Sequence, residues 1–139
     1  MRYLGLDLGT TTLGVSISDE TQTIASPLTV ITFKEKQYDT LLPKIKEIVN
    51  QYKIKGIVLG LPKNMNNTIG ERANTTLLFQ KKLEEYLNIE VILQDERLTT
   101  IEATNYMLEA DISRQKRKKK VDSLAASIIL QTYLDKMKG

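Results

Sequence analysis

The order in which hydrophobic patterns follow one another is the feature that most limits the fold of this chain. Three short apolar or alternating stretches come first, at 2–7, 13–18 and 23–33, and turn-forming residues separate them. Alternation with a period of two is typical of β-strands, and short turns between strands favour an antiparallel meander. Beyond residue 37 apolar residues recur at helical spacing, and helices then alternate with strands. A mixed sheet is therefore expected.

The second part of the chain supplies the remaining predicted elements. The stretch Ile54–Leu61, in which Ile57-Val58-Leu59 is continuously apolar, is typical of a strand buried on both faces. The predicted order is β-β-β-α-β-α-β-α-α, with the later elements at 38–49, 54–61, 70–87, 89–93, 99–110 and 121–137. We predict an α/β fold in which a five-stranded mixed sheet carries helices on both faces. Sites in such sheets gather at the carboxyl ends of parallel strands.

Length and composition favour one folded, soluble domain. The 139 residues fit a single domain over 1–139. Hydrophobic residues make up 41%, which is enough for a packed core. No apolar run approaches the roughly 18 residues of a membrane span, and Asp7 falls where a secretory leader needs an apolar stretch. We therefore expect a cytoplasmic protein without membrane contact.

The chain contains no cysteine and no histidine. This composition excludes disulfides, zinc sites built from Cys or His, cysteine nucleophiles and Ser-His triads. Catalysis must therefore use carboxylates, hydroxyls, lysines or a bound ion.

Asp7 is the first candidate for such chemistry. It lies in an apolar strand between Leu6 and Leu8, with Gly5 and Gly9 two positions away on either side. A carboxylate in that setting is costly unless it is hydrogen-bonded, paired or bound to a metal, and glycine permits close approach of a ligand. The alternative is a strand-end acid that caps the turn that follows.

Two further groups of acids are candidates. Asp95 and Glu96, followed by Arg97, come after the predicted fifth strand, and Asp122 is expected near the first turn of the last helix. Arg97 is suited to hold a phosphate with two hydrogen bonds. Taken singly, the first group also fits a solvated loop, and Asp122 also fits an ordinary acid that complements the helix dipole.

Basic and polar segments add possible contacts with a polyanion. Six cations fall in seven positions at 114–120, although the net charge is only +3. Such a block indicates either a nucleic-acid contact or a solvated loop. The segment 60–70 is rich in glycine, asparagine and threonine, and its backbone amides and side chains could hold a phosphate. An ordinary connecting loop is the alternative.

The combination favours metal-assisted hydrolysis of a phosphodiester. Three carboxylates from separate elements offer the oxygen ligands that Mg²⁺ or Mn²⁺ prefers, and this chemistry needs neither His nor Cys. We expect the basic side chains to attract the nucleic acid. The residues expected to contact it are Asn64, Thr68, Arg97, Lys116, Lys118, Lys119 and Lys120.

Taken together, these segments resemble the YqgF/RuvX family, which is also described as Holliday junction resolvase-like. The resemblance spans nearly the whole chain and rests on GLDLG at 5–9, GVSISD at 14–19, GLP at 60–62, DERLTT at 95–100 and KVDSLAA at 120–126. It implies a ribonuclease H-like fold and a nuclease site at Asp7, at the acidic pair before Arg97 and at Asp122. Of that pair we favour Glu96, and Asp95 remains the alternative.

The resemblance also implies a substrate. The family is described as a nuclease for the 5′ end of precursor small-subunit ribosomal RNA, so RNA and ribosomal precursor particles are the expected partners of a monomer or weak homodimer. Holliday junction DNA is the alternative. RuvC is similar but has an acid on its fourth strand, where this chain has Gly60. That difference weakens the case for junction resolution.

Two other functions remain as alternatives. The segment Asp7–Thr11 also resembles the first phosphate motif of the sugar kinase, actin and Hsp70 superfamily, but those proteins need two such domains and a second phosphate motif is missing here. A non-catalytic RNA-binding or transcription processivity factor on the same scaffold is harder to separate, because fold does not dictate function.

Overall fold

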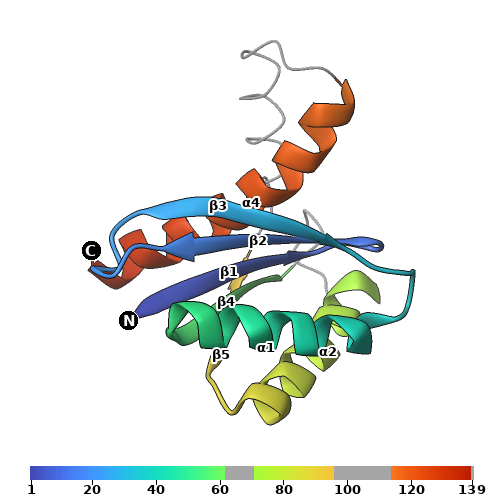
Figure 1. The fold of residues 1–139 in the computed structure, drawn as a ribbon, viewed down its shortest axis with the longest axis horizontal. Coiled ribbons are helices and arrows are strands. Elements are labelled where there is room, and N and C mark those ends of the chain that lie inside the picture. Colours follow the sequence, from blue (N-terminus) through green and yellow to red (C-terminus); the bar gives the residue numbers. More distant parts are fainter. Residues whose placement is uncertain (62–70, 96–113, 139) are drawn as a thin grey trace.

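A computed structural model describes residues 1–61, 71–95 and 114–138 of the chain. Its elements are five strands and three α-helices, with one short 3₁₀ turn before the first helix (Figure 1). In order, they are β1 (Arg2–Leu8), β2 (Thr12–Ser18), β3 (Ala25–Thr32), η1 (Tyr38–Thr40), α1 (Leu41–Tyr52), β4 (Ile54–Leu61), α2 (Glu71–Leu87), β5 (Val91–Asp95) and α4 (Arg114–Lys138).

The strands form one mixed sheet in the order β3-β2-β1-β4-β5. The meander β1-β2-β3 is antiparallel, while β4 lies parallel to both β1 and β5. The predicted five-stranded mixed sheet is thereby confirmed. The parallel strands β1, β4 and β5 end at the same edge of the sheet, which is where a site was expected.

Helices cover both faces of the sheet, as predicted. Figure 1 shows α1 and α2 on one side and α4 on the other. Even-numbered residues of β1 face the first side and odd-numbered ones face the second, because side chains alternate along a strand. The larger core lies under α1 and α2 and includes Leu4, Leu6, Leu13, Val15, Ile45, Leu59, Phe79 and Leu83. The smaller core lies under α4 and consists of Tyr3, Val58, Ile129, Leu130 and Leu134.

Helix α4 lies unusually close to β1 and β2. A Cβ atom placed on Gly5 would lie 2.8 Å from Leu130 Cβ and 2.9 Å from the Ala126 carbonyl oxygen, and it would also collide with Ser16 Oγ. The buried Ser16 hydroxyl donates a 2.8 Å hydrogen bond to that same carbonyl. Glycine at position 5 therefore allows the close approach, and Ser16 fixes it with a hydrogen bond.

Two strand boundaries differ from the prediction in a way that affects the site. β1 continues to Leu8, and β5 covers Val91–Asp95 rather than 89–93. The reason is pairing, because Leu61 of β4 lies opposite Asp95 and extends the parallel ladder beyond the apolar run. Asp95 is therefore part of the strand, and the expectation that it follows the strand was wrong.

The start of the last helix also differs from the prediction. α4 begins at Arg114 rather than at residue 121, so Asp122 lies in its interior and not in its first turn. Apolar periodicity begins only near Val121, but arginine, lysine and glutamine are good helix formers and extend the helix toward its N-terminus. The basic block is therefore helical rather than a loop. The helix expected at 99–110 falls outside the described residues.

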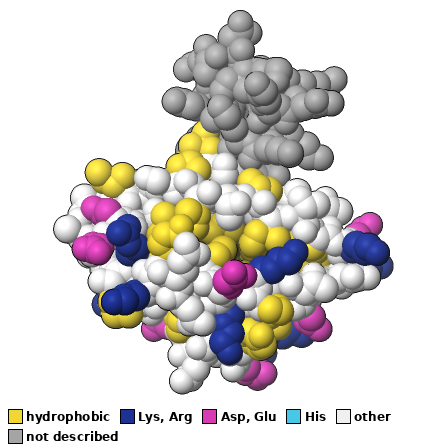
Figure 2. Space-filling view, in the orientation of Figure 1, with side chains coloured by type: hydrophobic (Ala, Val, Ile, Leu, Met, Phe, Trp, Pro, Cys, Tyr) yellow, Lys and Arg dark blue, Asp and Glu magenta, His cyan; other side chains and the backbone are white. Residues whose placement is uncertain are grey.

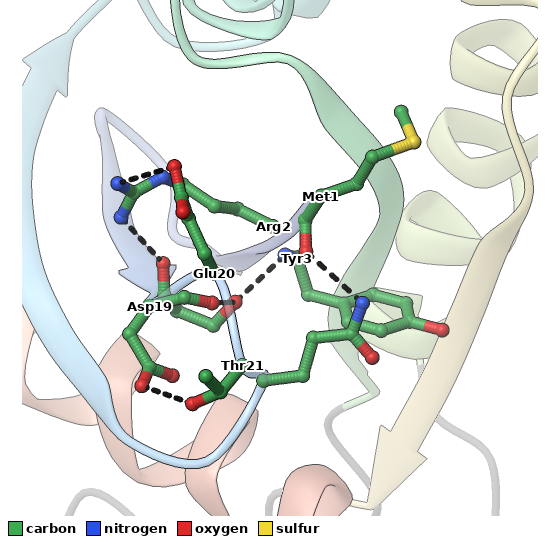
Figure 3. Close-up of polar contacts among 8 residues, drawn as sticks. Met1, Arg2, Tyr3, Asp19, Glu20 and Thr21 are labelled. Carbon is green, nitrogen blue, oxygen red and sulfur yellow. Dashed lines mark hydrogen bonds and ion pairs between the residues drawn. The ribbon is translucent and has the colours of Figure 1, made fainter.

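At the amino end of β1, a network of polar contacts closes the sheet (Figure 3). Arg2 donates a 3.2 Å hydrogen bond to the Ser18 carbonyl and lies 3.8 Å from the Glu20 carboxylate. The Tyr3 amide donates to Ser18 Oγ at 2.8 Å, and the Asp19 carboxylate accepts a 2.6 Å hydrogen bond from Thr21. These polar side chains are committed to holding the β2–β3 turn against β1.

Candidate functional site

Asp7 lies one residue before the carboxyl end of β1 and is partly buried. It belongs to the odd-numbered residues of that strand, with Tyr3 and Gly5, and so lies on the α4 face of the sheet. Its partner across the antiparallel pair is Gly14, which has no side chain to cover the carboxylate from that strand. The predicted close approach of a ligand to Asp7 stays a prediction.

The contacts of α4 show which part of the helix reaches the level of Asp7. The rings of Tyr3 and Tyr133 are 5.6 Å apart, and Gly5 meets Leu130 and Ala126. Contacts further along β1 thus involve earlier residues of α4, so the two elements run in opposite directions. Two strand residues span about 6.6 Å and four helical residues about 6 Å. Continued by one helical turn, this register predicts that the backbone of Asp122 lies at the level of Asp7.

The third predicted acidic group approaches this edge through β5. Position Gly60 pairs with Gln94, and Leu61 pairs with Asp95, at the carboxyl ends of β4 and β5. Glu96 is the next residue after the strand and falls outside the described residues. The sheet topology thus places the backbone of Asp95 at the edge that carries Asp7, with β4 between β1 and β5.

The basic block occupies the turns of α4 that precede its packed part. Figure 1 shows these first turns extending past the sheet, while the later turns lie across β1, β2 and β3. Positions 116, 118, 119 and 120 are therefore helical and lie between two and six residues before Asp122. Asn64, Thr68 and Arg97 fall outside the described residues, so their predicted contacts stay predictions.

Within 1–61, 71–95 and 114–138, no group of three or more acidic side chains with described positions is placed to hold a metal ion. None of α1, α2 and α4 combines the length and apolarity that a membrane span requires.

Sequence reasoning missed a cleft beside the site. It has a volume of about 390 Å³ and borders the β1 end at Leu8–Thr10, on the side of the sheet that α2 covers. Its other walls come from the β3–η1 connection and from the first turns of α2, including Lys36 and Arg72. Arg72 donates a 3.1 Å hydrogen bond to the Leu8 carbonyl. The only hint in the sequence was the Gly9-Thr10 turn, because it belongs to a segment that resembles a phosphate-binding motif.

Comparison with protein families gives a match over almost the whole chain. The family model described as "RuvX: Holliday junction resolvase" matches residues 1–136. The chain belongs to the RuvX family. The resemblance in the motifs is thereby confirmed, and membership places this RuvX-family protein among nucleases.

Curated relatives match with similar completeness. A protein of Clostridium botulinum is 51% identical over 99% of this chain and 98% of its own length, and it is named as a pre-16S rRNA nuclease. A Bacillus subtilis protein with the same name is 50% identical over 99% of both chains.

Solved structures confirm the fold. Thermus thermophilus RuvC in complex with a Holliday junction substrate superposes with a TM-score of 0.63 at 13% identity, covering 99% of this chain and 96% of that chain. The Fowlpox virus resolvase, in complex with Holliday junction DNA, gives a TM-score of 0.59 at 14% identity, with complete coverage of both chains. At such identities the likeness establishes a shared architecture, and this RuvX-family protein has the predicted ribonuclease H-like fold.

Proposed function

We propose that this RuvX-family protein is a divalent-metal-dependent nuclease that processes the 5′ end of precursor small-subunit ribosomal RNA. The observation that supports the proposal is the arrangement at one sheet edge. Asp7 lies there near the end of β1, and β5 ends there at Asp95, which Glu96 follows in the sequence. The register of α4 on β1 predicts that the backbone of Asp122 comes to the level of Asp7.

The donor set fits Mg²⁺ or Mn²⁺. Asp7, Glu96 and Asp122 offer carboxylate oxygens, which are the ligands that these hard cations prefer. They come from three separate elements, which allows them to surround an ion from different sides. When bound, the ion polarises the phosphate and activates water for hydrolysis. We assign all three carboxylates to the metal and favour Glu96 over Asp95.

The remaining predicted residues handle the substrate. The helical turns that carry Lys116, Lys118, Lys119 and Lys120 extend from the edge where Asp7 lies, so they can contact phosphates on one side of the cleaved bond. Such contacts are independent of base sequence and give affinity and position. Arg97 is assigned to the phosphate near the metal. Asn64 and Thr68, which follow β4 in the sequence, are assigned to positioning the nucleic-acid strand.

Similarity favours RNA over junction DNA as the substrate. The relatives named as pre-16S rRNA nucleases are 50–51% identical and match from end to end. The junction-bound RuvC and Fowlpox structures share only 13–14% of residues, which speaks for architecture alone.

The test is cleavage of a precursor RNA that carries the 5′ extension, with Mg²⁺ or Mn²⁺. Asp7→Asn should reduce the rate by at least about 100-fold and leave RNA binding equal or stronger, because one negative charge is removed. Asp19→Asn is the matched control, since Asp19 lies in the β2–β3 turn at the opposite end of the sheet. Full activity of Asp7→Asn would overturn the proposal.

Two parallel substrates separate the alternatives. Selective cleavage of a four-way DNA junction would replace RNA processing by junction resolution. Binding of RNA by the unmodified protein without cleavage of any substrate, including assembled precursor particles, would indicate a non-catalytic binding factor.

A further inference from the structure

We propose that the cleft beside Leu8–Thr10 is a second phosphate-binding site, which holds the nucleic-acid backbone next to the bond cleaved at Asp7. The inference rests on the proposed function in one respect only, namely that the ligand is a nucleic acid. It assigns a contact surface to residues outside the carboxylates and outside the basic turns of α4.

Three segments that are distant in sequence form the cleft. The turn after β1 contributes Gly9 and Thr10, the β3–η1 connection contributes Lys36, and α2 contributes Arg72 and Thr75. In Figure 1 these segments meet at the end of the sheet where β1 finishes. The volume of about 390 Å³ accommodates a phosphate with its sugar, and the threonine hydroxyls and guanidinium provide the polar contacts that such a group needs.

Arg72 is held in a fixed position at the wall of this cleft. One of its Nη atoms donates to the Leu8 carbonyl at 3.1 Å, which uses one of the five N–H donors of the guanidinium. The planar group keeps further donors in a rigid fork that matches two phosphate oxygens. The position of Arg72 is therefore set by the same strand that carries Asp7.

Lys36 lies across the cleft from α2 in a well-defined turn. Its backbone has a φ of 67°, and the turn is closed by a 2.9 Å hydrogen bond from the Gln37 amide to the Lys34 carbonyl. Within the described part of the chain, neither Lys36 nor Arg72 forms an ion pair with another described residue. Two cations and the single acid Glu35 line the cleft, which leaves one net positive charge for an anion.

The aromatic residue at the cleft is engaged elsewhere. Tyr38 packs against Phe33 and Phe79, with ring centroids 5.4 and 6.4 Å away, so its ring belongs to the protein core. Stacking on a nucleobase is therefore less favoured than contact with the sugar-phosphate backbone, and recognition at this site should not depend on base sequence.

The site lies one residue from the proposed reaction centre but on the other face of β1. Asp7 lies on the α4 side, and the cleft begins at Leu8 on the side of α2. A strand that crosses the edge of the sheet can thus place the reacting phosphate at Asp7 and a neighbouring phosphate between Lys36 and Arg72. The second contact would prevent the strand from sliding past the carboxylates.

The test compares two lysines in the same backbone conformation. Lys36→Asn and Lys53→Asn each remove one exposed positive charge at a left-handed position, with φ of 67° and 55°, and asparagine tolerates that conformation. Lys53 follows α1 at the opposite end of the sheet and does not line the cleft. Binding of a fluorescent single-stranded RNA is measured by fluorescence anisotropy without divalent metal. The salt concentration is varied from about 50 to about 300 mM, because nucleic-acid affinity changes steeply over roughly this range.

We expect Lys36→Asn to weaken binding and to reduce the slope of log K against log salt by about 0.7, the value for one lost phosphate contact on a single strand. Lys53→Asn should leave the slope unchanged. Equal slopes for the two variants would overturn the proposal. A second measurement follows the amide signals of Gly9, Thr10 and Lys36 by NMR during the RNA titration, and signals that do not shift would also overturn it.

This experiment does not depend on hydrolysis. A reduced slope for Lys36→Asn with an inactive unmodified enzyme would support the phosphate site and refute the nuclease. Cleavage that is lost in Asp7→Asn, with identical slopes for the two lysine variants, would support the nuclease and refute the site.

Discussion

The pKa of Asp19 is set by the hydrogen bonds of the turn in which it lies. It accepts hydrogen bonds from the Thr21 hydroxyl at 2.6 Å and from the amides of Thr23 and Ile24 at 2.7 and 3.1 Å. These bonds favour the charged form and lower the pKa of Asp19 from 3.8 to about 2, with the Thr21 hydroxyl as the largest cause. The contribution of the carboxylate to the turn is therefore complete above pH 3.8 and is lost as the pH falls through about 2.

We predict that Thr21→Val raises the pKa of Asp19 toward 3.8, because the strongest hydrogen bond to the carboxylate is removed. The measurement is an NMR titration of the Asp19 side-chain carbonyl carbon between about pH 1.5 and 6, a range that spans the usual pKa of an aspartate. Thr40→Val serves as control, since Thr40 bonds the Gln37 carbonyl in another turn. A pKa of Asp19 that is the same in all three proteins would contradict the assigned cause.

The residue scale also shows what the sequence could reveal of the site. Asp7 was identifiable because a charged residue inside an apolar strand is unusual, and the structure places it at the carboxyl end of β1, facing α4. The importance of Lys36 and Arg72 could not be foreseen. An arginine on an amphipathic helix and a lysine in a turn are ordinary surface residues until the fold brings them to one cleft.

Among the elements, the packing of α4 on β1 decides the geometry of the proposed site. The contact at Gly5, Ala126 and Leu130 lies one helical turn from Asp122 and two strand residues from Asp7. A change at Gly5 should therefore affect both stability and the distance between the two acids.

We predict that Gly5→Ala destabilises the protein by about 1–3 kcal/mol, the usual range for added volume in a packed core. Cleavage activity should fall by more than the loss of folded protein accounts for, because α4 must move away from β1. Denaturant unfolding and the cleavage rate are both measured. Gly56→Ala is the control, since its new Cβ would meet mainly the Tyr3 ring, far from Asp7. Unchanged stability and activity of Gly5→Ala would contradict the packing argument.

A milder change tests the same interface. Ser16→Ala removes the hydrogen bond to the Ala126 carbonyl without adding volume, so it should cost about 0.5–1.5 kcal/mol of the free energy of unfolding. Ser127→Ala is a comparison within α4, because its hydroxyl bonds the Leu124 carbonyl of its own helix. We expect a larger loss of cleavage from Ser16→Ala than from Ser127→Ala, and the reverse order would speak against β2 as an anchor for α4.

The first turns of α4 carry the other prediction at this scale. Basic residues at a helix N-terminus oppose the helix dipole, and the first turn of α4 contains no acid. The block is thus maintained despite a cost to the helix. Replacing Lys118, Lys119 and Lys120 by alanine should retain the helix and reduce the salt slope of RNA binding by up to about 2, at 0.7 for each contact. An unaltered slope, measured by anisotropy, would show that the block does not touch RNA.

Periodicity predicted the elements well where burial dictated the pattern. Strand β4 was placed at Ile54–Leu61 as found, because it is built around the apolar run Ile57–Leu59 and all of its residues except Lys55 are buried. Where backbone hydrogen bonding or helix propensity determines the end of an element, the observed boundary differs from the predicted one, as at Asp95 in β5 and Arg114 in α4. Apolar periodicity contains no information about ladders that continue through polar residues.

At the level of the whole molecule, the positive charge is distributed unevenly. On the face shown in Figure 2, acidic and basic side chains of the described residues alternate, with hydrophobic side chains between them. The dense basic block lies instead on the turns of α4 that project beyond the sheet. A modest net charge of +3 is therefore compatible with strong local attraction for a polyanion.

The position of α4 in the chain has a consequence for when the enzyme can act. All five strands are synthesised before α4, the helix that carries Asp122 and the basic block. A ribosome that has made only the sheet has produced a scaffold without one of the three carboxylates proposed for the metal and without the basic block proposed to contact RNA. Under the proposed function, activity against a ribosomal RNA precursor would therefore wait until α4 has left the ribosome that made it, and an unfinished chain would not cut RNA near its own site of synthesis.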